Sequence, residues 1–167
     1  MSLRRGFCVC GVRVSGTDLP KPTNGAVVPN ALKPFAHDDS WTLPLRGVSV
    51  THITIAFRLA LVFEADWEVP LEGPAHLSSR PLHNGSAPSL LPERREVAAA
   101  VFVFGSKVQS AVAFRAGALS IVFADGAHLY CVADPSFEAW QVTGPDGWRF
   151  LSQPGGSLAV WAHTSQG

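Results

Sequence analysis

The feature that most constrains this chain is a series of short apolar segments that runs from Trp41 nearly to the C-terminus. The later segments, in order, are KVQSAVAF, GALSIVFA, AHLYCVA, EAWQVT, WRFLS and SLAVWAH. Each segment has the length of one strand, and a turn signal separates it from the next. This pattern predicts an antiparallel meander.

The first two strands are expected in GVSVTHITIAF (47–57) and in the LALVF that follows it. β-Branched residues dominate both segments, which favours strand over helix. The alternation changes parity within the first strand: Val48, Val50 and His52 share one face, whereas Ile53, Ile55 and Phe57 share the other. Pro70 places the end of the next strand at a sheet edge, because proline cannot donate to a ladder.

One helix is predicted over residues 92–104. Pro92 suits a first helical turn, and the acidic residues Glu93 and Glu96 favour a helix N-terminus. Val97, Val101 and Phe104 have helical spacing, although the run from Val101 to Phe104 suits a strand equally well. The expected fold is therefore mainly β, an antiparallel meander forming a sheet, a sandwich or a small barrel, with one short helix. An α+β fold is the alternative.

The 167 residues predict one domain with additional segments. Residues 1–38 contain several prolines and an Asn-Gly pair without a sustained period, so a flexible or disordered extension is expected there. Residues 39–163 are expected to form a single β-rich domain, and residues 164–167 a tail. His37-Asp38-Asp39 is interpreted as solvated linker.

Two stretches of the chain resemble each other. GVSVTHITIAFRLALVF (47–63) and GSKVQSAVAFRAGALSIVF (105–123) both begin with Gly, carry Val at the fourth position and contain Ala-Phe-Arg before an apolar strand. A duplicated hairpin and chance similarity both explain this. In a duplication, Arg58 and Arg115 are matched, solvent-facing hairpin residues.

Most of the acids between Phe123 and Phe150 are interpreted as corner residues. Asp125-Gly126 lies between two alternating apolar runs and predicts a hairpin in which both turn residues have positive φ. Asp134-Pro135 predicts a turn in which the Asp side chain binds its own backbone. Type I and type II turns are expected at 144–147 and 153–156, respectively. Glu138 is the acid that no turn explains.

Composition narrows the classes of partner. The formal net charge is zero, which favours neither nucleic acid nor an anionic membrane. Only 16% of residues are charged, and a weakly charged surface favours association with another protein or a homodimer. No apolar run reaches the ~20 residues that span a membrane. The Arg4-Arg5 pair resembles an export signal, but Arg13 interrupts the apolar region, so a cytoplasmic location is expected.

No catalytic, metal or cofactor motif is recognised. The three cysteines, Cys8, Cys10 and Cys131, are interpreted as reduced thiols, since Cys-x-Cys is not a usual zinc spacing. The six histidines have no partner at metal spacing, and His52, in mid-strand, is the best candidate among them. The weak candidates for binding are Glu138, Trp140, Trp148 and Trp161. Core packing is the alternative for the tryptophans.

Four segments carry a resemblance to a known family: WTLPLRGVSVTHI, LSIVFADGAHL, DPSFEAWQVTGPDG and SQPGGSLAVW. The chain resembles, from about Trp41 to Trp161, an uncharacterised actinobacterial family, domain-of-unknown-function family 6188. Glu-Ala-Trp at 138–140 and the later Pro-Gly-Gly are the most specific matches. Phe137 stands where a Tyr is common, and the first 40 residues have no counterpart. The resemblance implies a small β-rich domain and transfers no activity or site.

Three functional hypotheses follow. The first is a non-catalytic protein-interaction module, such as an immunity-like or regulatory partner. The second is a β-barrel that binds a small ligand, with tryptophans lining it. The third is an enzyme that uses Glu138 with a histidine, which requires the two side chains to lie within hydrogen-bonding distance.

Overall fold

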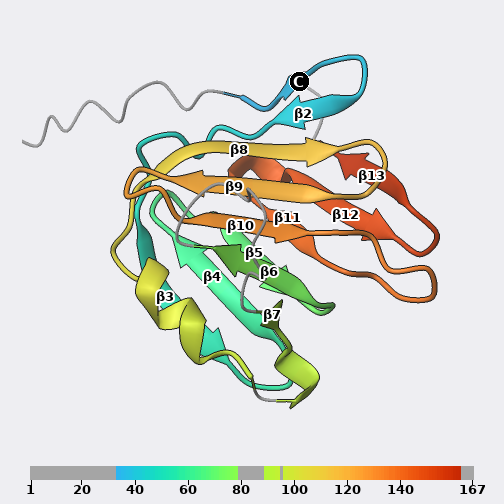
Figure 1. Ribbon diagram of the computed structural model, residues 1–167. Coiled ribbons are helices and arrows are strands. Elements are labelled where there is room, and N and C mark those ends of the chain that lie inside the picture. Colours follow the sequence, from blue (N-terminus) through green and yellow to red (C-terminus); the bar gives the residue numbers. More distant parts are fainter. Residues whose placement is uncertain (1–32, 79–88, 95, 163–167) are drawn as a thin grey trace, which may run out of the picture. The chain divides into compact units, whose positions relative to one another are not determined.

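The computed structural model describes residues 33–78, 89–94 and 96–162, all of which belong to one compact unit, Ala31–Gly167 (Figure 1). The first described strand, β1 (Phe35–Ala36), begins before the expected domain boundary at residue 39. Residues 1–32 of the predicted extension lie outside the described residues, and so does the tail at 164–167.

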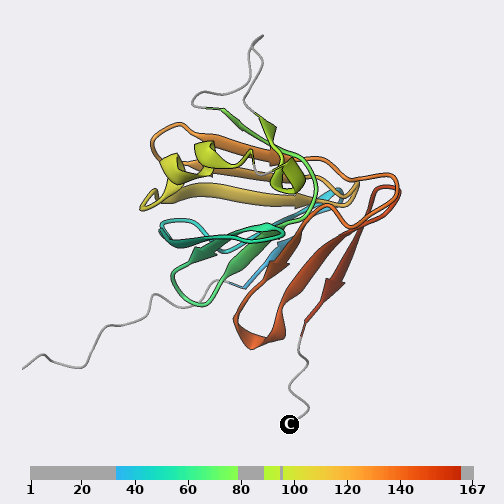
Figure 2. The ribbon, with the colours of Figure 1, turned by 90° about the horizontal axis from the view of Figure 1, so that it is seen from below.

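The described strands form two antiparallel sheets, which Figure 2 shows as separate layers. The seven-stranded sheet contains, in spatial order, β1, β2 (Ser40–Thr42), β8 (Val108–Phe114), β9 (Leu119–Phe123), β10 (His128–Cys131), β6 (Ala75–Ser78) and β7 (Ser89–Leu90). The six-stranded sheet contains β13 (Ser157–Trp161), β12 (Arg149–Gln153), β11 (Gln141–Thr143), β5 (Glu68–Leu71), β4 (Leu59–Phe63) and β3 (Val50–Ile55).

The predicted antiparallel, mainly β fold is therefore confirmed, and of the three expected arrangements the described residues form a two-sheet sandwich. Neither sheet closes into a barrel, because each ends in two different edge strands. The edge predicted from Pro70 is wrong, because β5, which contains it, lies between β4 and β11. One hydrophobic cluster takes side chains from both sheets, with Trp140, Phe123 and Phe150 the largest fully buried ones. Burial of this common core stabilises the sandwich.

The helix expected at 92–104 is present as two 3₁₀ segments, η1 (Pro92–Arg94) and η2 (Ala98–Val103). An antiparallel bridge between Leu91 and Glu96 separates them, since each residue's N–H donates to the other's carbonyl. The buried face also differs from the predicted one: Val97, Ala100 and Val103 are buried, whereas Val101 and Phe104 are exposed. The reason is that side chains three residues apart eclipse one another in a 3₁₀ helix.

The two resembling stretches fold as the same unit. In β3–β4 and in β8–β9, a bulge follows the first buried valine, Val50 or Val108. That valine pairs with the last residue of the next strand, Phe63 or Phe123. The bulge adds one residue to the first strand, which is why the apolar parity changes within it.

The equivalence continues into the third strand of each unit. β5 pairs with β4 in the register in which β10 pairs with β9, so that Val69 opposite Leu61 matches Leu129 opposite Ile121. The next strands are exchanged between the sheets: β6, after β5, pairs with β10, whereas β11, after β10, pairs with β5. Each half thus contributes its fourth strand to the sheet of the other half. We call this reciprocal arrangement the approximate two-fold exchange.

Backbone hydrogen bonds where the two units meet also form equivalent pairs, in which donor and acceptor units are interchanged. The four bonds are Gly47 N to Val108 O (2.7 Å), Gly105 N to Val50 O (2.9 Å), Val108 N to Val48 O (2.9 Å) and Val50 N to Ser106 O (3.1 Å). Gly47 and Gly105 both have positive φ, 81° and 74°, which glycine adopts without strain.

One detail of the predicted repeat is wrong: Arg58 and Arg115 are not equivalent residues of the two hairpins. Ala56 N donates to Arg58 O at the tip of the first hairpin, whereas Phe114 N donates to Ala118 O in the second. Ala56 is thus equivalent to Phe114, and the shared Ala-Phe-Arg letters are out of step by one residue. Arg58 and Arg115 are both exposed, as expected, but occupy different positions.

Two of the predicted corners are confirmed. The carboxylate of Asp134 accepts hydrogen bonds from Ser136 N (2.7 Å) and Phe137 N (2.9 Å). At 153–156, Gly156 N donates to Gln153 O, and Gly155 in the third position has φ 84°, as a type II turn requires.

The other two corners differ from the prediction. Gly126 has positive φ in the β9–β10 turn but Asp125 does not, and Gly126 N donates to Phe123 O. This is a type I turn followed by a left-handed glycine. At 144–147, Asp146 and Gly147 both have positive φ, and Trp148 N donates to Pro145 O. The hairpin with two left-handed residues lies there instead, in η3 (Pro145–Gly147).

Candidate functional site

Trp140, a predicted binding residue, is part of the core. Its side chain is fully buried, and Nε1 donates to the carbonyl of Gly117 at 2.8 Å. Ser152 Oγ donates to the same carbonyl, also at 2.8 Å. Packing between the sheets, the alternative considered for the tryptophans, therefore explains Trp140.

Glu138 lies in the connection between β10 and β11 and is exposed. Its carboxylate makes no hydrogen bond or ion pair with the part of the chain that the structure describes. The described histidines, His37, His52, His76 and His128, contact hydroxyl groups rather than carboxylates. His83 and His163 lie outside the described residues. The structure thus does not bring Glu138 together with a described histidine.

Trp148 and Trp161 lie at the end of the six-stranded sheet that is opposite β3. Trp148 is partly buried and stacks on Phe150, with ring centroids 5.9 Å apart, and both rings contact Trp41. Trp161, on the edge strand β13, is about half exposed, and the Arg149 guanidinium lies 5.5 Å from its ring centroid. Such a cation–π contact covers one face of the indole.

Described acids, histidines and cysteines do not gather into a group that could hold a metal ion. The one described cysteine, Cys131, is free and buried, and its Sγ lies 3.3 Å from the carbonyl oxygen of Pro74. Burial raises the pKa of this thiol to about 12, which disfavours the thiolate form that a nucleophile or a metal ligand requires. Burial also lowers the pKa of His128.

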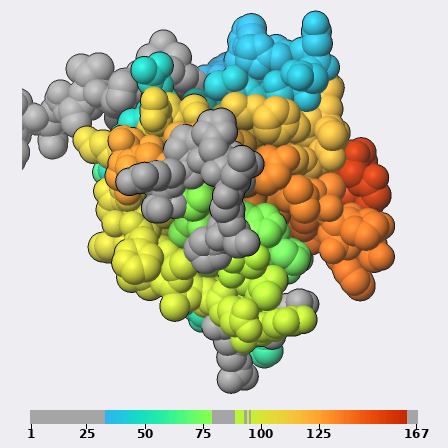
Figure 3. Space-filling model, viewed as in Figure 1, coloured from blue at the N-terminus to red at the C-terminus, as the bar shows by residue number. Residues whose placement is uncertain are grey.

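The main exposed apolar surface lies elsewhere, on η2 and on the edge strand β3 beside it. We call it the η2–β3 face and define it by five side chains that are each more than half exposed: Ile55, Phe57, Val101, Phe102 and Phe104. η2 lies between β3 and β7, edge strands of different sheets (Figures 1 and 2). Figure 3 shows η2, in yellow, at the surface.

The η2–β3 face is free of formal charge. Neither residues 47–57 nor residues 97–106 contain an Asp, Glu, Lys or Arg. Natural edge strands are usually protected by charged residues, proline or a covering segment. Between His52 and Ile55, no described strand pairs with the outer side of β3. The face therefore has the composition of a contact surface rather than of a protected edge.

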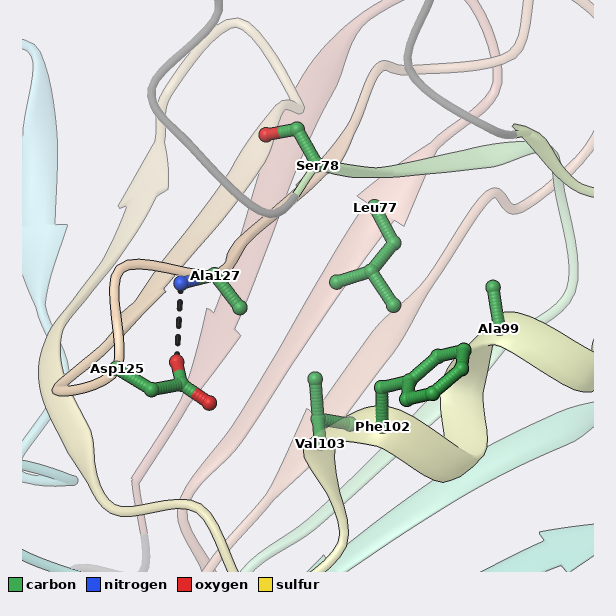
Figure 4. A pocket seen from close by; sticks show the side chains of 7 residues that line it. All are labelled: Leu77, Ser78, Ala99, Phe102, Val103, Asp125 and Ala127. Carbon is green, nitrogen blue, oxygen red and sulfur yellow. Dashed lines mark hydrogen bonds between the residues drawn. The ribbon is translucent and has the colours of Figure 1, made fainter.

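A pocket of about 440 Å³ lies behind η2, toward the seven-stranded sheet (Figure 4). Its lining residues are Leu77, Ser78, Ala99, Phe102, Val103, Asp125 and Ala127. Asp125 brings the one ionisable side chain among them. Its carboxylate already accepts hydrogen bonds from Ala127 N (2.9 Å) and Ser106 Oγ (3.0 Å). The cavity is thus mostly apolar, and its one carboxylate already accepts hydrogen bonds from the protein.

Comparison with known proteins places the chain in a family. A model of a family of unknown function, DUF6188, matches residues 41–162. The chain belongs to this family. The DUF6188 match begins at Trp41 in β2 and includes both copies of the repeated unit, the η2–β3 face and the pocket. Neither the curated proteins nor the solved structures contain a match. The resemblance predicted from the sequence is confirmed for the family, which brings no activity with it.

None of the four predicted site residues lies on the η2–β3 face. The sequence contained a signal for it: two charge-free stretches around an expected strand and helix, in a chain with 26 charged residues, 13 basic and 13 acidic. Within the described residues, no helix is long and apolar enough to cross a membrane.

Proposed function

We propose that this DUF6188 protein is a non-catalytic protein-interaction module and that the η2–β3 face is its contact surface. The observation that supports this most directly is the exposure of five large apolar side chains on a surface without formal charge. Soluble monomers rarely expose such groups together, and apolar aromatic surface is the main source of binding energy at protein interfaces.

The shape of the face also supports a protein partner. Its aromatic side chains are exposed on η2, directly after η2 and at the tip of the β3–β4 hairpin, and only Phe102 among them also lines the pocket. An edge strand offers backbone donors and acceptors beside them, which an extended protein segment can use. A regulatory or immunity-like partner fits this role.

Affinity capture of the tagged full chain from its native host tests the proposal. Phe102→Ser removes the most exposed ring of η2, so we expect a partner enriched with the wild type to be lost. Phe137→Ser is the matched control, because Phe137, in the β10–β11 connection away from the face, is 73% exposed against 83% for Phe102. Capture that Phe102→Ser and Phe137→Ser leave equally intact would contradict the η2–β3 face as the contact surface.

A second candidate is small-ligand binding, which the pocket behind η2 favours. Its volume lies within the ~300–1,000 Å³ of typical ligand sites, and its lining is mainly apolar. The barrel expected for this function is not formed, so the ligand would bind beside η2 and not between the sheets. Nile red, an uncharged apolar probe, should show enhanced fluorescence with the wild type and none with Ala99→Phe, which fills the pocket.

The proposal also includes the location and the origin of the protein. A cytoplasmic location fits the free, buried thiol of Cys131. An actinobacterial origin is what the resemblance to this family implies.

A further inference from the structure

At one edge of the sandwich, the described residues have no counterpart to a strand that covers the equivalent edge. β3 and β8 are equivalent strands of the two repeated units. The outer side of β8 pairs with β2, whereas β3 is the last described strand of its sheet. The approximate two-fold exchange therefore marks a strand position beside β3 that no described strand fills.

The chain segment that would fill this position is coiled instead. Leu45 and Val103 are equivalent: both are buried, and each carbonyl accepts a hydrogen bond from the third residue after it, Val48 or Ser106. Two residues earlier the copies diverge. Leu43 continues an extended strand and is 1% exposed, whereas its counterpart Val101 lies in η2 and is 60% exposed. Because η2 is coiled, this segment does not pair with the outer edge of β3.

β2 shows what a strand in that position presents. Its residues Trp41 and Thr42, which Leu43 follows, run antiparallel to β8, with Trp41 opposite Ala113 and Thr42 opposite Val112. Leu43 N donates to Ala111 O at 2.9 Å. The covering strand therefore has a large apolar side chain on either side of a central threonine.

β3 carries the same pattern. The positions of β3 that are equivalent to Ala111, Val112 and Ala113 are Ile53, Thr54 and Ile55. Read as a covering strand, Ile53-Thr54-Ile55 has apolar residues flanking a threonine, as Trp41-Thr42-Leu43 has. A strand with this sequence, placed antiparallel beside β3, reproduces the β2–β8 arrangement.

We propose that β3 pairs antiparallel with β3 of a second copy of the chain, with Thr54 opposite Thr54 of the partner subunit on a two-fold axis. This inference rests on the proposed function and names the partner. Ile53 then lies opposite Ile55 of the partner subunit, and the two exchange backbone hydrogen bonds. The six-stranded sheets of the two subunits become one continuous sheet.

Charge and area favour a second copy as the occupant. A two-fold contact places each residue against its own surface, which repels where the surface is charged. Residues 51–57, which would lie opposite one another in this register, are uncharged, so the pairing sets no like charges directly opposite each other. The exposed rings of Phe57, Phe102 and Phe104 present on the order of 500 Å² together, at roughly 200 Å² for a full aromatic side chain. With the strand edge added, this approaches the ~800 Å² per partner of a stable interface.

Sedimentation equilibrium of the full chain over a range of concentrations tests the pairing. We expect a dimer for the wild type and at least a tenfold higher dimer Kd for Thr54→Lys, which sets two lysines opposite each other. Thr54 is exposed, so folding is retained, and circular dichroism checks this. Ser157→Lys is the matched control, because it adds the same charge to β13, the other edge of the same sheet, and should leave the Kd unchanged.

A cross-link tests the register. Directly opposite residues of a non-hydrogen-bonded antiparallel pair have Cα atoms about 4.5 Å apart, which a disulfide spans. In a Cys8→Ser/Cys10→Ser background, Thr54→Cys should give a covalent dimer on oxidation and Ser157→Cys should not. A monomeric wild type, or a dimer that Thr54→Lys leaves intact, would overturn the inference. A monomer that still captures a host protein through Phe102 would leave the proposed function standing.

Discussion

At the scale of single residues, one backbone carbonyl determines the role of Trp140. The Gly117 carbonyl is the shared acceptor for Trp140 Nε1 and Ser152 Oγ, and all three groups lie in the core. Gly117 can present it because its φ of 83° is accessible to glycine, and a Cβ there would lie 2.9 Å from that of Ala133. Trp140, a predicted binding residue, thus links the two sheets.

The shared acceptor makes Trp140 and Ser152 energetically coupled. Trp140→Phe and Ser152→Ala each leave the carbonyl with one partner, whereas the double variant leaves it buried and unsatisfied. We expect the double variant to lose about 1 kcal/mol more than the sum of the singles, measured by urea unfolding. Strict additivity of the three free energies would show that the two bonds are independent.

Cys131 provides a second test at this scale. Burial raises its thiol pKa from 9.0 to about 12 in the folded chain, so the unfolded state ionises first as pH rises. The contribution of Cys131 to stability is therefore complete below pH 9 and decreases above it. In a Cys8→Ser/Cys10→Ser variant, Ellman's reagent should not react at pH 8 until denaturant is added. Rapid reaction of the native protein would mean that the thiol is accessible.

How far the sequence predicted the site depends on the residue. Asp134 was recognised as a corner because its turn chemistry is local. The roles of the four candidates, Glu138 and three tryptophans, could not be resolved, because exposure and pairing depend on strands far away in sequence. Phe102 was missed because the same letters fit a buried strand and an exposed 3₁₀ segment.

At the scale of elements, turns were predicted by residue type but not always by geometry. The β4–β5 hairpin places Ala65 (φ 57°) and Asp66 (φ 59°) in the left-handed region, with Phe63 N donating to Trp67 O. No glycine announces this turn. A left-handed conformation costs an ordinary L-residue about 1–2 kcal/mol, so the flanking strand pairing enforces it.

The strain at Ala65 predicts a stabilising substitution. Ala65→Gly removes the left-handed cost and adds chain entropy to the unfolded state, for an expected net gain of about 0.5–1 kcal/mol. Ala124→Gly is the control, because Ala124 lies in the equivalent β9–β10 turn without positive φ and should lose stability. Thermal unfolding followed by circular dichroism compares the two. A loss of stability in Ala65→Gly as large as in Ala124→Gly would contradict the assigned strain.

The bulges illustrate a second limit at this scale. The change of parity after Val50 was visible in the sequence, and a bulge in β3 accounts for it. Its cause becomes clear only beside β8, where the bulge after Val108 occupies the same place. Hydrophobic alternation alone does not distinguish a bulge from a strand that is buried on both faces.

At the scale of the whole molecule, the repeated unit accounts for the fold. The proposed interface lies where the two copies of the unit differ. The paired hairpins were suggested by the sequence, but the exchange of β6 and β11 between the sheets was not, since non-local pairing leaves no local signal. The copies are alike from their central glycines, Gly47 and Gly105, through the third strand. They differ mainly in the segment before those glycines, which is extended in one copy and coiled in the other.

This difference between the copies predicts opposite effects on stability for substitutions at the equivalent positions Leu43 and Val101. Leu43→Ala should cost about 2–5 kcal/mol because the side chain is 1% exposed, whereas Val101→Ala should change stability by less than about 0.5 kcal/mol. Val103→Ala controls for the chemical change: it truncates a buried valine of the same η2 segment and should cost more than Val101→Ala. Urea unfolding at a concentration below the dimer Kd isolates these effects within one chain. If Val101→Ala proved as costly as Leu43→Ala, the segment before Gly105 would be packed in the monomer like that before Gly47, and the strand position beside β3 that no described strand fills would not exist.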